Sequence, residues 1–185
     1  MRKVLALRRN SRLKPNPSDY LLKMRGGIEI GKTRLIAAII AASVFVIDMI
    51  TKAVITHTFV LGESMEVING FFDIVYVINR GAAFSILNNA GMLGTLILIG
   101  ASVVALGILI YLIGQSKILL TTVALSLIAG GAAGNLVDRV RLGFVVDFLD
   151  LHVGRLHWPA FNAADSAITV GVVLAVYAFY IKKQS

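Results

Sequence analysis

Four long apolar runs dominate this sequence and restrict what it can fold into. They contain 22, 25, 20 and 19 residues, and a helix needs about 20 apolar residues to cross a hydrocarbon core of about 30 Å. Each run is therefore predicted to be a transmembrane helix, at residues 35–56, 90–114, 118–137 and 163–181. Charged residues make up only 15% of the chain, against about 25% in soluble domains. The fold class expected is a membrane-embedded four-helix bundle.

The segment before the first run differs in composition. Residues 1–32 are polar and basic, and the chain up to Arg34 holds ten of its eighteen lysines and arginines. We expect residues 1–32 to form a partly disordered cytoplasmic extension, in which Pro15 and Pro17 break any helix. Residues 33–185 are then the membrane domain.

The distribution of positive charge predicts the orientation in the membrane. With four spans, both termini and the 115–117 turn lie on one side, which carries 13 lysines and arginines; the other side carries four. The positive-inside rule therefore makes both termini cytoplasmic and exposes residues 57–89 and 138–162 on the extracytoplasmic side. The net charge of +8 follows from this topology, so no nucleic-acid partner is expected.

The first outer segment has the composition of a small β-sheet. Residues 59–68 and 71–78 are rich in β-branched and aromatic side chains, and Asn69-Gly70 lies between them. Asn-Gly between such runs is the strongest short hairpin signal. We expect a small sheet that forms a platform at the membrane surface.

Polar residues gather at one predicted depth of the membrane. Asp48 and Lys52 share a helix face near the outer end of the first span, and Asp165 begins the fourth. An ionised group at such a depth is costly unless it is paired or functional. The sequence therefore predicts a polar pocket that opens to the outer face. The other residues expected at this depth are Asn79, Asn135, Asp138, Arg139 and Asp147.

Two of these carboxylates suggest a chemistry. Asp147 lies in the apolar stretch Phe144–Leu149, and Asp165 lies at a helix start, which favours its ionised form. Two carboxyl groups in a partly apolar pocket share one proton, so that one acts as base and the other as acid. This is the chemistry of aspartic peptidases. From the residues alone, Asp138 ranks as high as Asp147 for this role.

Other interpretations of the same residues stay open at this stage. Two pairs of charged residues, Asp48 with Lys52 and Asp138 with Arg139, could be structural ion pairs. The glycines of residues 130–134 could form a surface for close helix packing. A small transporter or proton relay is the alternative function, because intramembrane carboxylates also serve transport. The three histidines lack metal-binding spacing and there are no cysteines, so no zinc site is expected.

Five motifs in order resemble one bacterial family, signal peptidase II, the lipoprotein signal peptidases. The resemblance covers about residues 35–182 and rests on these stretches: Asp48-x-x-Thr51-Lys52, Asn79-Arg80-Gly81-Ala82-Ala83-Phe84, Gly134-Asn135-Leu136-Val137-Asp138-Arg139, Val145-Val146-Asp147-Phe148 and Trp158-Pro159-Ala160-Phe161-Asn162-Ala163-Ala164-Asp165-Ser166.

The resemblance implies an activity and a set of roles. It implies an aspartic endopeptidase of the bacterial cytoplasmic membrane, with its active site at the outer leaflet. Its substrate would be a diacylglyceryl-modified prolipoprotein, cut just before the lipid-modified cysteine, and it would work without a cofactor. Membrane lipid would surround the protein, and nothing in the sequence demands more than a monomer. The catalytic pair would be Asp147 and Asp165, with these residues lining or bracing the site: Asp48, Lys52, Asn79, Asn135, Asp138, Arg139, Asn162 and Ala163.

Overall fold

The computed structural model describes the backbone of residues 17–81 and 91–184, and the side chains of residues 31–81 and 91–180. The chain divides into two compact units, Met1–Lys32 and Thr33–Ser185. Predictions for residues 1–16 and for the Ala82-Ala83-Phe84 part of the second motif lie outside the described residues.

Helix α1 spans Pro17–Thr58 and includes the first candidate membrane span, Gly31–Thr58. The expectation that the prolines break any helix in the basic segment is therefore wrong from Pro17 onward. Proline is tolerated in the first turn of a helix, where its missing N–H has no intrahelical partner and its fixed φ suits the helix.

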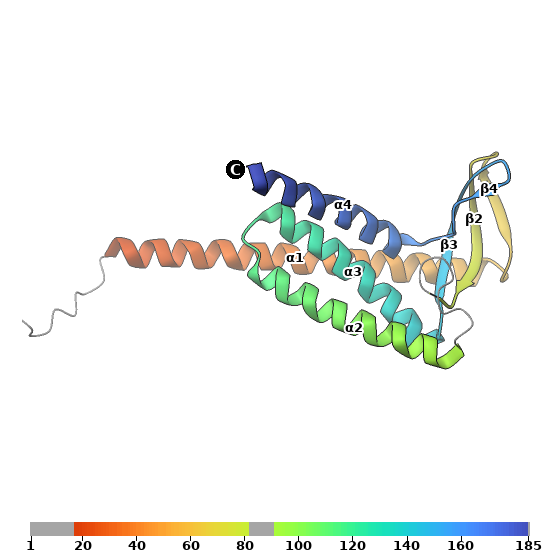
Figure 1. The fold of residues 1–185 in the computed structure, drawn as a ribbon, viewed down its shortest axis with the longest axis horizontal. Coiled ribbons are helices and arrows are strands. Elements are labelled where there is room, and N and C mark those ends of the chain that lie inside the picture. Colours follow the sequence, from red (N-terminus) through yellow and green to blue (C-terminus); the bar gives the residue numbers. More distant parts are fainter. Residues whose placement is uncertain (1–16, 82–90, 185) are drawn as a thin grey trace, which may run out of the picture. The chain divides into compact units, whose positions relative to one another are not determined.

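The other three predicted spans correspond to α2 (Gly91–Gln115), α3 (Leu119–Leu142) and α4 (Ala163–Gln184) (Figure 1). Helix α3 extends five residues beyond its predicted end at 137. It stops at Gly143, which has the left-handed φ of 78° and donates its N–H to the Arg139 carbonyl at 3.1 Å. As a result, Asp138 and Arg139 lie in the last turns of a helix and not in a loop.

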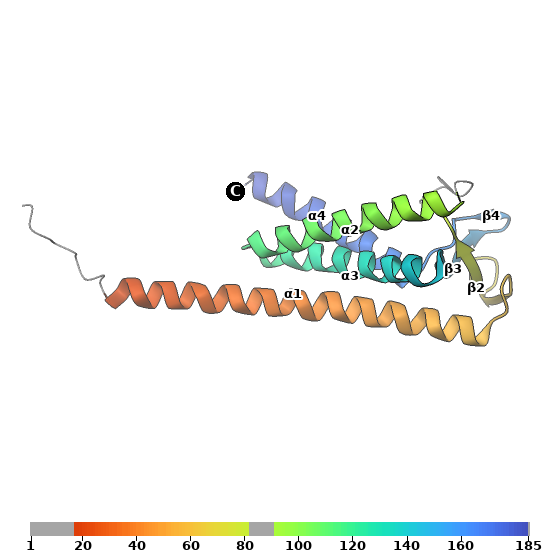
Figure 2. The ribbon, with the colours of Figure 1, turned by 90° about the horizontal axis from the view of Figure 1, so that it is seen from below.

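Glycines allow α3 to approach two other helices closely. A Cβ at Gly130 would lie 2.6 Å from the Ala41 carbonyl oxygen of α1, and one at Gly131 would collide with the Ala164 carbonyl of α4. Across the same contact, a Cβ at Gly171 would lie 2.7 Å from the Ala124 oxygen. The prediction that the 130–134 glycines form a helix-packing surface is confirmed. Figure 2 shows α2, α3 and α4 running side by side with the membrane part of α1.

A four-stranded antiparallel sheet lies at one end of the bundle, where α1 ends and α4 begins (Figure 1). The predicted hairpin is confirmed as β1 (Ser64–Ile68) and β2 (Phe72–Asn79), although residues 59–63 form no strand. The order β1-β2-β3-β4 is completed by two strands that the sequence did not predict, β3 (Val145–Val153) and β4 (Leu156–His157). Strand β3 places Asp147 in a sheet, facing the helices.

Candidate active site

Asp147 is held between a strand and a helix start. In the β2–β3 register Asn79 pairs with Val145, so Asn79 and Asp147 lie diagonally on one face of the sheet. Asn79 Nδ2 donates to Asp147 Oδ2 at 3.1 Å, and Asn162 Nδ2 donates to Asp147 Oδ1 at 2.7 Å. The residue is only 2% exposed. Both carboxyl oxygens therefore have amide partners in a site that excludes most water.

Asp165 reaches the same place from the first turn of α4. Asn162 is the N-cap of this helix: its Oδ1 accepts the Asp165 N–H at 2.9 Å. The same side chain donates through Nδ2 to Asp147. One asparagine therefore connects the two aspartates, because its oxygen binds the backbone of one and its nitrogen the carboxyl group of the other. Asp165 is partly exposed, so it is the more accessible member of the pair.

A second asparagine, Asn135 of α3, completes the link. Its Nδ2 donates to Asp165 Oδ1 at 2.7 Å, while its Oδ1 accepts from Asn162 Nδ2 at 3.2 Å. Asn135 and Asn162 are both buried. The carboxyl groups of Asp147 and Asp165 thus belong to one hydrogen-bonded network built from α3, α4 and the sheet.

Behind this network lies a buried ion cluster. Lys52 Nζ is 2.7 Å from Asp48 Oδ2, 2.9 Å from Asp138 Oδ2 and 3.0 Å from Asn135 Oδ1. The predicted i,i+4 pair of Asp48 and Lys52 is present, but Asp138 forms its salt bridge with Lys52 of another helix and not with the adjacent Arg139. All three charged groups are buried, so their mutual pairing is what makes their burial tolerable.

The remaining predicted residues lie at the edge of the site. Arg139 is partly buried, donates through Nη1 to the Asn135 carbonyl at 3.2 Å and interacts electrostatically with both Asp147 and Asp165. Ala163 packs against the small apolar cluster of Ile55, Val146 and Phe148. The structure therefore brings together all ten predicted site residues at one end of the bundle.

The surroundings of Asp147 change its acidity. Burial is the largest influence and, together with the charge of Asp165, raises the pKa of Asp147 to about 7; hydrogen bonds from Asn79 and Asn162 and the charge of Lys52 act in the opposite direction. A carboxyl group with this pKa retains a proton near neutral pH. A buried carboxyl group that holds a proton beside a second, more exposed one is an arrangement that acid–base catalysis by two carboxyl groups can use.

Backbone donors are the part of the site that the sequence analysis missed. Asp48 Oδ1 accepts the Ala164 N–H at 2.9 Å, and Asp138 Oδ2 accepts the Val146 N–H at 3.3 Å. No sequence pattern predicts a contact between a side chain and a backbone N–H group of a segment this far away in the chain. These contacts explain why Asp138, which ranked equal to Asp147 from sequence, lies outside the pair.

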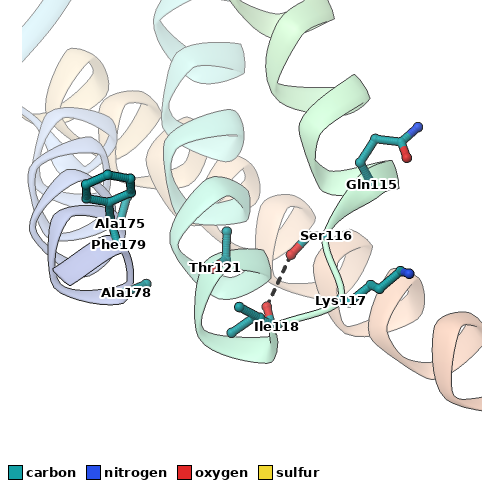
Figure 3. A pocket seen from close by; sticks show the side chains of 8 residues that line it. All are labelled: Gln115, Ser116, Lys117, Ile118, Thr121, Ala175, Ala178 and Phe179. Carbon is teal, nitrogen blue, oxygen red and sulfur yellow. Dashed lines mark hydrogen bonds between the residues drawn. The ribbon is translucent and has the colours of Figure 1, made fainter. Parts of the chain in front are cut away.

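Two cavities in the described part of the chain lie away from the aspartates. One, of about 390 Å³, is at the opposite end of the bundle, between the α2–α3 turn and the last turns of α4 (Figure 3). The other, of about 380 Å³, lies on the sheet beside His152 and His157, whose ring centroids are 4.7 Å apart in a stacked arrangement. Neither cavity is lined by Asp147 or Asp165.

The fold is that of a helical membrane protein with a buried polar site at one end of the bundle, and comparison with known proteins gives the family. The profile described as signal peptidase (SPase) II matches residues 40–181. The chain belongs to the signal peptidase II family.

Relatives with the name lipoprotein signal peptidase cover most of the chain. The protein of Syntrophus aciditrophicus (strain SB) is 42% identical over 148 residues, which are 78% of this chain and 92% of the relative. That of Janthinobacterium sp. (strain Marseille) is 49% identical over 144 residues, which are 75% and 84% of the two chains.

A solved structure has the same fold. It is described as a bacterial membrane enzyme determined by the in meso method at 2.3 Å resolution, and it superposes with a TM-score of 0.72 and 36% identity over 80% of this chain and 89% of that one. Together with four helices of membrane-spanning length and composition, this makes the chain a multi-pass membrane protein.

Proposed function

We propose that this protein is an aspartic endopeptidase that removes signal peptides from diacylglyceryl-modified bacterial prolipoproteins and cuts just before the lipid-modified cysteine. The observation that carries the proposal is the link between Asp147 and Asp165 through Asn162, which joins their backbone and side-chain groups within one buried network. The relatives' name, lipoprotein signal peptidase, supports the substrate class.

The proposed reaction uses one proton held by the pair. Asp165, as carboxylate, takes a proton from water while the water oxygen attacks the scissile carbonyl carbon. Asp147 gives its proton to the carbonyl oxygen, which produces a neutral tetrahedral diol. When the C–N bond breaks, Asp165 passes its proton to the leaving nitrogen and the diol returns one to Asp147. Water is added across the amide, and the pair regains its initial state without a metal or organic cofactor.

The proposed location is the outer leaflet of the bacterial cytoplasmic membrane. The site lies at the end of the bundle that carries the sheet, and the α2–α3 turn with Lys117 lies at the other end. In the sequence, residues 1–34, 115–117 and 182–185 together carry 13 of the eighteen lysines and arginines, which supports a cytoplasmic placement of both termini and of the α2–α3 turn. A lipid-modified cysteine keeps the scissile bond near the outer interface, which is the depth of the two aspartates. Nothing in this mechanism requires more than a monomer.

The other site residues divide into two groups in this proposal. Asn79, Arg139 and Ala163 lie at the partly exposed edge and contact the substrate. The buried residues behind the pair hold it in place: Asp48, Lys52, Asn135, Asp138 and Asn162.

The test replaces each aspartate separately by its amide isostere. Asp147→Asn and Asp165→Asn should fold and bind lipid-modified prolipoprotein, but cleavage should fall by about 10³-fold or more, because each variant lacks one proton-transfer group. Asp150→Asn is the matched control, since it makes the same change on the same strand, at a residue whose Oδ2 contacts His157 at 2.8 Å. Wild-type cleavage by either pair variant would overturn the assignment.

A further inference from the structure

The cavity of about 390 Å³ at the end of the bundle opposite the sheet has no part in the proposed reaction. Its lining divides by chemistry into two halves. The α2–α3 turn and the first turn of α3 supply the polar half, which consists of Gln115, Ser116, Lys117 and Thr121. The apolar half consists of Ile118, Ala175, Ala178 and Phe179. Figure 3 shows the two halves on different sides, with Gln115 and Lys117 near the turn and Phe179 across on α4.

The cavity lies where the membrane spans end. The span of α3 begins at Leu119 and the span of α4 ends at Tyr180, so the lining residues belong to the terminal turns of the spans or to the turn just outside them. This is the level at which lipid headgroups meet acyl chains. Water cannot solvate the apolar half favourably, and hydrocarbon cannot satisfy the polar half. A molecule that is itself amphipathic matches both halves.

Two small side chains of α4 make room for such a molecule. Ala175 and Ala178 are three residues apart and therefore share one face of the helix. Ala178 is only 8% exposed, whereas the neighbouring Phe179 is 72% exposed. The helix thus has a hollow beside a large apolar side chain that stands out toward lipid, and an acyl chain can lie in this hollow against the ring.

The distribution of charge gives the sign of the headgroup. Residues 33–185 contain eight acidic residues, and all eight lie toward the sheet: in the C-terminal part of α1, in the sheet or the turn before it, in the last turns of α3 or in the first turn of α4. The cavity end has Lys117 and also Arg34, whose Nη2 donates to the Gly114 carbonyl at 3.4 Å. In the sequence, Lys182 and Lys183 follow the span of α4. Basic residues at a membrane surface attract anionic lipids.

We propose that this cavity binds one anionic phospholipid from the leaflet that borders it. The phosphate lies at the rim on the side of Lys117, with Arg34 adding positive charge at the end of α2, and one acyl chain lies against Ala175, Ala178 and Phe179. A free phosphate ion would leave the apolar half uncovered, and a second copy of this chain would bring like charges together. The bound lipid links the α2–α3 turn to α4 and stabilises this end of the bundle.

The first test measures lipid binding to the full chain after delipidation in detergent. Native mass spectrometry gives the apparent Kd for phosphatidylglycerol and for phosphatidylcholine with the same acyl chains. We expect phosphatidylglycerol to bind more tightly, and Lys117→Gln and Arg34→Gln each to weaken its binding about fivefold while phosphatidylcholine binding stays unchanged. The basic segment of residues 1–32 is the same in all variants, so its own attraction for anionic lipid cancels.

The matched control removes one positive charge at the other end of the same bundle. Arg141 is an exposed residue in the last turn of α3, toward the sheet. Arg141→Gln should leave the affinity for phosphatidylglycerol unchanged. An equal loss of affinity in Arg141→Gln and Lys117→Gln would mean that overall charge attracts the lipid and that the cavity is not the site.

The second test fills the apolar half. Ala175→Leu places a larger side chain in the hollow, so it should weaken the binding of both phospholipids and reduce the rise in Tm that phosphatidylglycerol produces. Ala105→Leu makes the same change at an exposed position of α2 and should leave binding and the rise in Tm as in the wild type. If Ala175→Leu also binds and responds like the wild type, the acyl chain does not lie in this cavity.

Three further results would contradict the inference. Equal affinity of the wild type for the two phospholipids would exclude a site that selects negative charge. Equal protection by glycerol 3-phosphate, which has the anionic group without acyl chains, would indicate a site for a free anion. A concentration-dependent dimer whose cross-links join Phe179 of two copies would make the cavity face an interface between chains. These measurements use no cleavage assay, so their outcome is independent of whether Asp147 and Asp165 are the catalytic pair.

Discussion

Helices α2 and α3 lie side by side, and they show opposite relations between polarity and burial. Helix α2 has 25 residues without a charge, yet only Gly94 of them is buried. Helix α3 is less apolar and buries nine residues, all small or polar: Thr122, Ala124, Ser126, Ala129, Gly130, Gly131, Gly134, Asn135 and Asp138.

The difference shows which kinds of residue are buried between the helices of a membrane protein. Lipid solvates apolar side chains as well as a protein core does, so large apolar residues gain little by turning inward. Small residues let helices approach, and polar residues need partners that lipid cannot supply. The interior of this bundle is therefore a surface of glycine, alanine and polar groups on α3, and the proposed active site is the end of that surface nearest the sheet.

The largest difference expected between the two helices appears when one glycine of each is replaced by alanine, which adds one methyl group. A Cβ at Gly134 of α3 would collide with the Asp48 carboxylate, whereas one at Gly107 of α2 meets nothing within 4 Å. Gly134→Ala should lower the free energy of unfolding by about 1–3 kcal/mol and also lower cleavage, because Asp48 anchors the start of α4. Gly107→Ala should leave both unchanged or slightly raise stability. If the two variants had equal effects in thermal unfolding and cleavage assays, the proposed difference between α2 and α3 would be wrong.

A much smaller effect is expected from removing apolar atoms on the lipid side. Val104 of α2 is 64% exposed in the structure, so lipid fills the space that Val104→Ala leaves. The change in unfolding free energy should stay within about 0.5 kcal/mol. A loss near the 2–5 kcal/mol range that is typical of emptied protein cores would mean that α2 has a protein partner on this face.

The sequence predicted those features that depend on local patterns. Apolar runs predicted the four spans, Asn69-Gly70 predicted the β1–β2 hairpin, and the ordered motifs led to the family and to the set of site residues. Spacing also predicted the Asp48–Lys52 pair, because residues four apart on a helix are neighbours.

Features that depend on distant contacts were not predicted. Val145–Val153 is β3 because it pairs with β2, about 70 residues earlier in the chain, and β propensity reflects such pairing more than intrinsic preference. Likewise, Asp138 and Asp147 look equivalent in sequence. They differ because Lys52 and the Val146 N–H bind the first, while Asn79 and Asn162 bind the second.

The central claim is that Asp147 and Asp165 work as a pair that holds one proton, and the pH dependence of kcat/KM for lipid-modified prolipoprotein tests it most directly. Asp147 must be protonated to act as acid, and its pKa is raised to about 7, so the rate should fall about tenfold per pH unit above that value. The account therefore predicts a rate that declines above about pH 7, whereas a rate that stays constant from about pH 5 to about pH 9 would contradict it.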